Sequence, residues 1–73
     1  MNWANHIESK PEVLFGKPVI AQTRIAVDLV LEKLGNGDSI DQLLEAYPHI
    51  TKEQILACLS FAADQIKNEV VFH

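Results

Sequence analysis

The distribution of apolar residues along the chain predicts a series of helices after an extended start. The strongest pattern lies in the last third, where residues 55–63 are almost continuously apolar. Thr51 and Gln54 match a capping box, in which each side chain satisfies the backbone N–H of the other residue. Ile50 and Ile55 occupy the two positions of a hydrophobic staple. We therefore predict that a long helix begins at Thr51.

This long helix is apolar over most of its circumference. Its apolar residues form one stripe at spacings of three and four with two flanks: Ile55, Leu59, Ala62, Ile66 and Val70 in the stripe, Leu56 and Ala63 on one flank, and Cys58 and Phe61 on the other. The remaining face, which we expect to be exposed, carries Ala57, Ser60, Asp64 and Lys67. A helix of this kind needs cover on more than one side. We expect part of that cover to come from another chain, beginning with a second copy.

Two shorter helices are predicted before the long one. The first covers residues 26–34 and ends at Gly35-Asn36-Gly37, because its apolar residues fall on one face: Val27, Val30, Leu31 and Leu34. A second capping box, Ser39 with Gln42, opens the next helix, which ends at Pro48. Two helices joined by the short turn 47–50, after a third helix, predict a tri-helical helix-turn-helix core.

Residues 1–25 are predicted to be an extended, β-containing arm. Pro11 and Pro18 prevent a helix, and short strands are expected near residues 6–8 and 18–20. Two isolated strands are weak in water unless another strand or a helix supports them. Pairing across a dimer would supply that support. We thus expect one mainly helical domain over residues 1–73, with an arm (1–25) and a three-helix core (26–73), assembled as a homodimer.

The small size of the chain also favours self-association. A domain of 73 residues buries only about 60% of the surface that its unfolded chain exposes. Small folds usually add disulfides, a metal or oligomerisation. One cysteine, Cys58, excludes an internal disulfide, and His6, His49 and His73 lie too far apart in the sequence for metal-site spacing. Oligomerisation is the remaining expectation, with no cofactor or metal.

Charge and cysteine content indicate the setting. The net charge is −4, with +1 in residues 1–25 and −5 in residues 26–73. Because nucleic-acid affinity comes largely from Lys and Arg that neutralise phosphates, the acidic helical part counts against DNA binding by the helices alone. The free thiol, the lack of a signal-peptide pattern at residues 1–6 and the lack of any stretch long enough to span a membrane predict a cytoplasmic protein without membrane contact.

Enzyme activity is not expected. The carboxylate pairs Asp28/Glu32 and Asp41/Glu45 lie four residues apart on predicted exposed helix faces, where solvated charge explains them better than acid–base catalysis. Ser39 is explained as a helix cap, and Gly35 and Gly37 follow a helix instead of opening a phosphate-binding one. These patterns predict a binding protein.

Two sets of residues are candidates for binding. Contact with a partner protein or a second copy is expected at Phe15, Ile55, Leu59, Phe61, Ala62, Ile66, Val70 and Phe72. Aromatic residues are common anchors at such interfaces. An alternative function is a DNA-binding regulator, because the first turn of the second helix in a helix-turn-helix faces base edges. Its candidate residues are Lys17, Arg24, Lys52 and Gln54.

Five short motifs occur in a specific order between residues 6 and 66: Gly16-Lys17-Pro18-Val19-Ile20, Thr23-Arg24-Ile25, Gly37-Asp38-Ser39, Tyr47-Pro48-His49-Ile50-Thr51 and Ala62-Ala63-Asp64. In this order they resemble a short bacterial family known as domain-of-unknown-function family 433. The resemblance implies a homeodomain-like, winged-helix-like fold. It also implies the antitoxin of a toxin–antitoxin pair, whose toxin is a PIN-like ribonuclease, and antitoxins of that kind typically bind their own promoter. A third interpretation is a structural subunit of a larger complex.

The chain departs from the pattern of that family at three places. Ala21-Gln22 stands where an arginine and a glycine are usual, which removes a cation and a residue that adopts positive φ without strain. Phe15 replaces a usual glycine, and Ala26 replaces a usual proline at the expected first helical position. The missing arginine weakens the case for promoter binding, whereas Phe15 enlarges the apolar contact surface.

Overall fold

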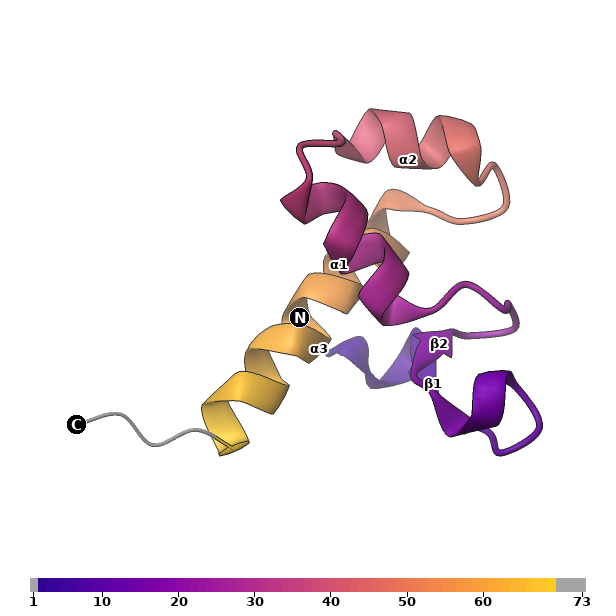
Figure 1. Ribbon diagram of the computed structural model, residues 1–73, viewed down its shortest axis with the longest axis vertical. Coiled ribbons are helices and arrows are strands. Elements are labelled where there is room, and N and C mark those ends of the chain that lie inside the picture. The colour runs from indigo at the N-terminus through magenta and orange to yellow at the C-terminus, as the bar shows by residue number, and fades with distance from the viewer. Residues whose placement is uncertain (1, 70–73) are drawn as a thin grey trace.

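The structure is a computed structural model and describes residues 2–69. Over this range it contains three α-helices, one two-stranded antiparallel sheet and two short 3-10 helices (Figure 1). The elements follow in the order η1 (Trp3–Asn5), β1 (Ile7–Glu8), η2 (Leu14–Gly16), β2 (Val19–Ile20), α1 (Val27–Gly35), α2 (Ile40–Ala46) and α3 (Lys52–Glu69). The prediction of a mainly helical protein with a β-containing N-terminal arm is confirmed.

The two strands pair with each other inside one protomer. Ile7 lies opposite Ile20 and Glu8 opposite Val19, and β1 packs on α3. Both predicted strands are present, so the sequence located them correctly. The expectation that they need a second copy for pairing is not supported, because β1 and β2 supply each other's hydrogen bonds and α3 supplies the helix beneath them.

Local sequence signals set the starts of the second and third helices. In α2, the Gln42 N–H donates to Ser39 Oγ (3.1 Å) and the Ser39 N–H donates to Gln42 Oε1 (2.7 Å). The same reciprocal pair opens α3, with distances of 3.2 and 2.9 Å between Thr51 and Gln54. Each such cap stabilises its helix by about 1 kcal/mol. Both predicted capping boxes are confirmed.

Helix α1 differs by one residue at each end from its predicted range. Ala26 is the N-cap, with an extended backbone and no side-chain cap, so it is not the first helical residue. The helix ends at Gly35, and Gly37 then adopts φ +102° while its N–H donates to the carbonyl of Leu34 (3.0 Å). A left-handed glycine after the last turn is a common way to end a helix.

Arm and helices share one hydrophobic core. The arm contributes Ile7 and Ile20, and the staple residues Ile50 and Ile55 are both buried. The helices and the turn before α3 complete the core with Val27, Val30, Leu43, Ala57 and Cys58. The C-terminal end of α3 extends beyond the other elements (Figure 1). A small domain thus leaves part of its longest helix with little cover.

Candidate interaction surface

One face of α3 is covered by the N-terminal arm. Ala57 and Cys58 on this face are fully buried. The indole of Trp3 lies edge-on against the ring of Phe61, with centroids 4.8 Å apart and an interplanar angle of 89°. Trp3 Nε1 donates a hydrogen bond to Asp64 Oδ2 (2.6 Å). The arm therefore joins this face of α3 through apolar packing and one charge-assisted hydrogen bond.

This arrangement corrects the predicted orientation of α3. The sequence pattern assigned Ala57, Ser60 and Asp64 to an exposed face, but Ala57 is fully buried and the other two are half-buried. Small side chains allow the arm to approach closely, and the indole N–H satisfies the carboxylate. Lys67 is exposed as predicted.

The other face of α3 is open and apolar. Leu59 is 42% exposed and Ile66 57% exposed. These residues are seven apart, so they lie on one side of the helix, with Ala62 between them. Ala62 and Phe61 are half-buried. We call Leu59, Ala62 and Ile66 the open stripe.

An apolar groove runs beside the open stripe, between α1 and α3, with a volume of about 260 Å³. Val27 and Leu31 line its α1 side, and Pro18 also lines it. The α3 side consists of Phe61, Ala62, Gln65 and Ile66. The sequence pattern assigned Val27 and Leu31 to the core-facing side of α1, and it gave no signal that the same helix also borders a groove.

A single ion pair marks the edge of this groove. Lys17 Nζ lies 2.7 Å from Asp28 Oδ2, and both side chains are more than half exposed. The hydrogen bond from Lys17 is the main reason that the pKa of Asp28 is lowered from its ordinary value. Apolar lining with a charged edge is the usual composition of a protein interface, with its apolar centre and polar rim.

The predicted partner-contact residues separate into three groups. Leu59, Phe61, Ala62 and Ile66 border the open stripe or the groove. Phe15 is fully exposed but lies on η2. Ile55 is 0% exposed. The inclusion of Ile55 in a contact surface is therefore wrong, because its side chain packs in the core of the protomer.

The remaining two predicted contact residues, Val70 and Phe72, lie outside the described residues.

The predicted DNA-binding residues are not gathered into one cationic surface. Lys17 is paired with Asp28, and Gln54 uses its side-chain oxygen to cap α3. Arg24 and Lys52 are exposed, on the loop before α1 and in the first turn of α3. Of the four candidates, two thus have roles inside the protomer.

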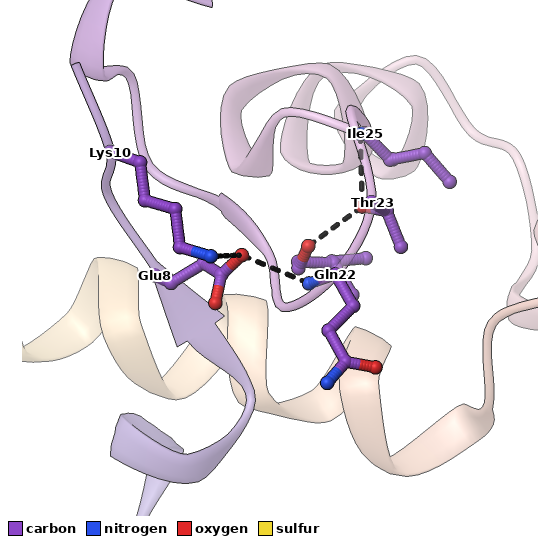
Figure 2. Close-up of polar contacts among 6 residues, drawn as sticks. Glu8, Lys10, Gln22, Thr23 and Ile25 are labelled. Carbon is purple, nitrogen blue, oxygen red and sulfur yellow. Dashed lines mark hydrogen bonds and ion pairs between the residues drawn. The ribbon is translucent and has the colours of Figure 1, made fainter. Parts of the chain in front are cut away.

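The turn between β2 and α1 contains the departures at Ala21 and Gln22. Gln22 adopts φ +62°, so this position keeps a left-handed backbone without a glycine. Its N–H donates to Glu8 Oε2 (3.0 Å), and the same oxygen lies 3.5 Å from Lys10 Nζ (Figure 2). Thr23 Oγ1 donates to the carbonyl of Ile20 (2.7 Å) and accepts from the Ile25 N–H (3.0 Å) (Figure 2). Together these polar contacts fix the turn and bring it close to the residues that follow β1.

The chemistry of the other reactive groups is limited. Burial raises the pKa of the Cys58 thiol to about 11, which disfavours the reactive thiolate at neutral pH. Among residues 2–69, no three His, Cys, Asp or Glu side chains lie close enough together to bind a metal ion. Over the same range, none of the helices has the length and apolar character needed to span a bilayer.

Comparison with known proteins identifies relatives of this chain. The uncharacterized protein y4eO of Sinorhizobium fredii is 37% identical over 49 residues, which cover 67% of this chain and 22% of that protein. This chain thus spans less than a quarter of that relative. A crystal structure of a DUF433 member from Anabaena variabilis superposes with a TM-score of 0.78 at 30% identity, covering 90% of this chain and 68% of the other.

The family described as "Protein of unknown function (DUF433)" matches residues 7–62, which include both strands, the first two helices and more than half of α3. The resemblance noted from the five sequence motifs is confirmed. This chain belongs to the DUF433 family.

Proposed function

We propose that this protein is a non-enzymatic, antitoxin-like binding module that forms a homodimer and neutralises a PIN-like ribonuclease. The observation that supports protein binding is the open stripe on α3, where Leu59 and Ile66 are 42% and 57% exposed beside an apolar groove. Exposed apolar surface that is contiguous and has a polar rim is typical of interaction sites. The class of partner comes from the family resemblance.

The shape of the surface favours a helical or extended segment of the partner. A long helix with an apolar stripe binds another amphipathic segment through anchors at i, i+3, i+4 and i+7. Leu59, Ala62 and Ile66 have this spacing. The Lys17–Asp28 pair at the edge of the groove then contributes to the orientation of the partner more than to its affinity.

A nuclease assay tests this function. The probe is the PIN-like ribonuclease that this proposal expects a neighbouring gene to encode, and the measurement is RNA cleavage as this protein is added. We expect the wild type to stop cleavage at a near-stoichiometric ratio. Leu59→Asp places a charge on the open stripe and should weaken the inhibition at least tenfold. Ala46→Asp places the same charge on an exposed position of α2 and should leave inhibition unchanged.

Two results would contradict the proposal. One is a gene neighbourhood without such a nuclease, which instead favours a structural subunit of a larger complex. The other is full nuclease activity in the presence of an excess of folded wild-type protein.

A DNA-binding regulator is the second candidate, and the arrangement of α2 and α3 favours it. The two helices are joined by the five residues 47–51, and Lys52 in the first turn of α3 is exposed. Titration against the DNA upstream of the gene at two salt concentrations tests this function. Binding with a steep salt dependence supports it, and absence of binding at low salt removes it.

A further inference from the structure

The loop at η2 displays an aromatic side chain on a strained backbone. Phe15 is 102% exposed, so its ring has essentially no contact within the protomer. Leu14 and Phe15 both adopt positive φ, +48° and +57°. Two consecutive residues other than glycine in this region are uncommon, and such strain persists only where the surrounding structure imposes it.

Hydrogen bonds on both sides hold this loop in place. The Gly16 N–H donates to the carbonyl of Val13 (3.1 Å), and the Lys17 N–H donates to that of Leu14 (3.2 Å). The Ser9 hydroxyl donates to the carbonyl of Gly16. With Leu14 half-buried, this backbone directs Phe15 away from the protomer. Neither the strain nor the exposure of the ring is compensated by a contact of Phe15 within the protomer.

The α1–α3 groove has a suitable size and lining for such a ring. Its volume is about 260 Å³, whereas an apolar cavity of about 150 Å³ is large enough to bind benzene. Val27, Leu31 and Ile66 provide apolar walls. The chain therefore carries both an exposed aromatic ring and an apolar groove that a ring fills.

The two parts of the chain that meet in such a contact differ in net charge. Lys10 and Lys17 flank the ring, and each lies near a carboxylate of its own protomer, Glu8 and Asp28. The α1 edge of the groove carries Asp28, and Glu32 is exposed one turn further along the same helix. The whole chain shows the same asymmetry, with +1 in residues 1–25 and −5 in residues 26–73. Contact between these parts therefore avoids like-charge repulsion, and the apolar ring and groove supply the attraction.

We propose that Phe15 of one copy inserts into the α1–α3 groove of a second copy, and that the exchange is reciprocal about a two-fold axis. Lys17 is two residues from Phe15 and also lines the groove, so ring and groove are neighbours on one surface. An isologous interface uses the same patch on both copies, which this proximity allows. The inference rests on the self-association part of the proposed function and identifies the residues that form it.

Sedimentation of the full chain over a range of concentrations tests the inference. Wild type should form a dimer, and Phe15→Gly should weaken its association about 1,000-fold, because each interface anchor contributes about 30-fold and two are lost. Glycine also relieves the positive-φ strain, so the variant monomer should be at least as stable as wild type. Loss of the dimer with retained stability separates a lost contact from a damaged fold.

A second variant tests the groove. Ala62→Phe places a large side chain in the groove and should also prevent dimerisation. The double variant Phe15→Gly/Ala62→Phe should have no weaker association than the single variants, because both changes remove the same contact between the ring and the groove. Ala46→Phe is the matched control: it places the same large side chain on an exposed position of α2, outside the groove, and should leave the dimer intact.

The outcomes separate this inference from the wider proposal. A dimer that survives Phe15→Gly with unchanged affinity overturns the insertion of Phe15 and leaves self-association standing. A wild type that remains monomeric at millimolar concentration overturns both. Nuclease inhibition is measured independently, so neither result decides whether a ribonuclease is bound.

Discussion

The two faces of α3 differ in cover although both carry apolar residues. The face beneath the arm carries the small residues Ala57 and Cys58 and the carboxylate of Asp64, yet it is the better covered. The open stripe carries Leu59 and Ile66, which are larger and fully apolar, yet both are exposed. The arm face also carries Phe61, and the stripe begins at the buried Ile55, so hydrophobicity alone does not predict which face is covered.

The comparison shows what decides cover in a chain of this size. Small residues let the arm approach α3 closely, and the indole N–H of Trp3 donates a hydrogen bond to the carboxylate of Asp64 on this face. No described segment is left to cover the larger residues. The arm therefore packs on the face of α3 that allows close approach, and Leu59 and Ile66 in the open stripe stay exposed.

The most direct test of cover uses the same substitution at two positions of one stripe of α3, the buried Ile55 and the exposed Ile66. Ile55→Ala should lower the free energy of unfolding by about 3 kcal/mol, because it leaves a cavity in the core. Ile66→Ala should cost at most about 0.5 kcal/mol, since its side chain is already 57% exposed. Urea denaturation followed by circular dichroism, at a concentration where the chain is monomeric, measures both. Equal losses would contradict the difference in cover between the two ends of this stripe.

Cys58 gives a test through pH. Because its pKa is raised to about 11 in the folded state from about 9 when unfolded, the unfolded chain loses the proton first as pH rises. The stability that the buried, protonated thiol contributes is fully present below pH 9 and is lost as the pH rises through 11. Wild type should therefore lose about 2 kcal/mol of stability relative to Cys58→Ala between pH 8 and 11. A constant difference between the two proteins would show that the thiol is accessible to water.

Trp3→Phe tests the polar contact that holds the arm. The change keeps an aromatic ring near Phe61 but removes the donor to Asp64, and should cost about 1.5 kcal/mol. Asp64→Asn retains an acceptor and should cost less. Thermal unfolding measures both variants. If Trp3→Phe were neutral, packing alone would hold the arm on α3.

The smallest expected effect is a gain. Gln22→Gly relieves the strain at φ +62° and keeps the backbone N–H that donates to Glu8, so the melting temperature should rise by an amount equivalent to about 1 kcal/mol. Ala21→Gly is the control, because its backbone φ is not positive, and it should be neutral or destabilising. The gain should leave the open stripe unaffected, so self-association should not change.

The sequence predicted the elements well and their contacts less well. Capping boxes at Ser39 and Thr51 are local signals, because both partners lie within one turn, and they located two helix starts correctly. The hydrogen bond between Trp3 and Asp64 joins residues 61 positions apart. A periodicity argument has no access to such a contact, and therefore it placed the wrong face of α3 toward solvent.

The candidate site was predicted in part for the same reason. Leu59 and Ile66 could be identified from their spacing, because they lie on one stripe of one helix. The groove requires α1 beside α3, and Lys17 next to Asp28, which only the tertiary structure brings together. Lys17 was a candidate for DNA contact because it lies in the basic N-terminal part, and its pairing with Asp28, eleven residues away, has no local sequence signal.

The contact of Trp3 with Phe61 and Asp64 also makes the arm observable in solution. The chain contains one tryptophan, so its intrinsic fluorescence reports a single place in the fold, where the arm joins α3. Detachment of the arm would transfer that indole to water and shift its emission to longer wavelengths, even while the helices remain formed. Undocking of this segment can thus be followed spectroscopically without any added label.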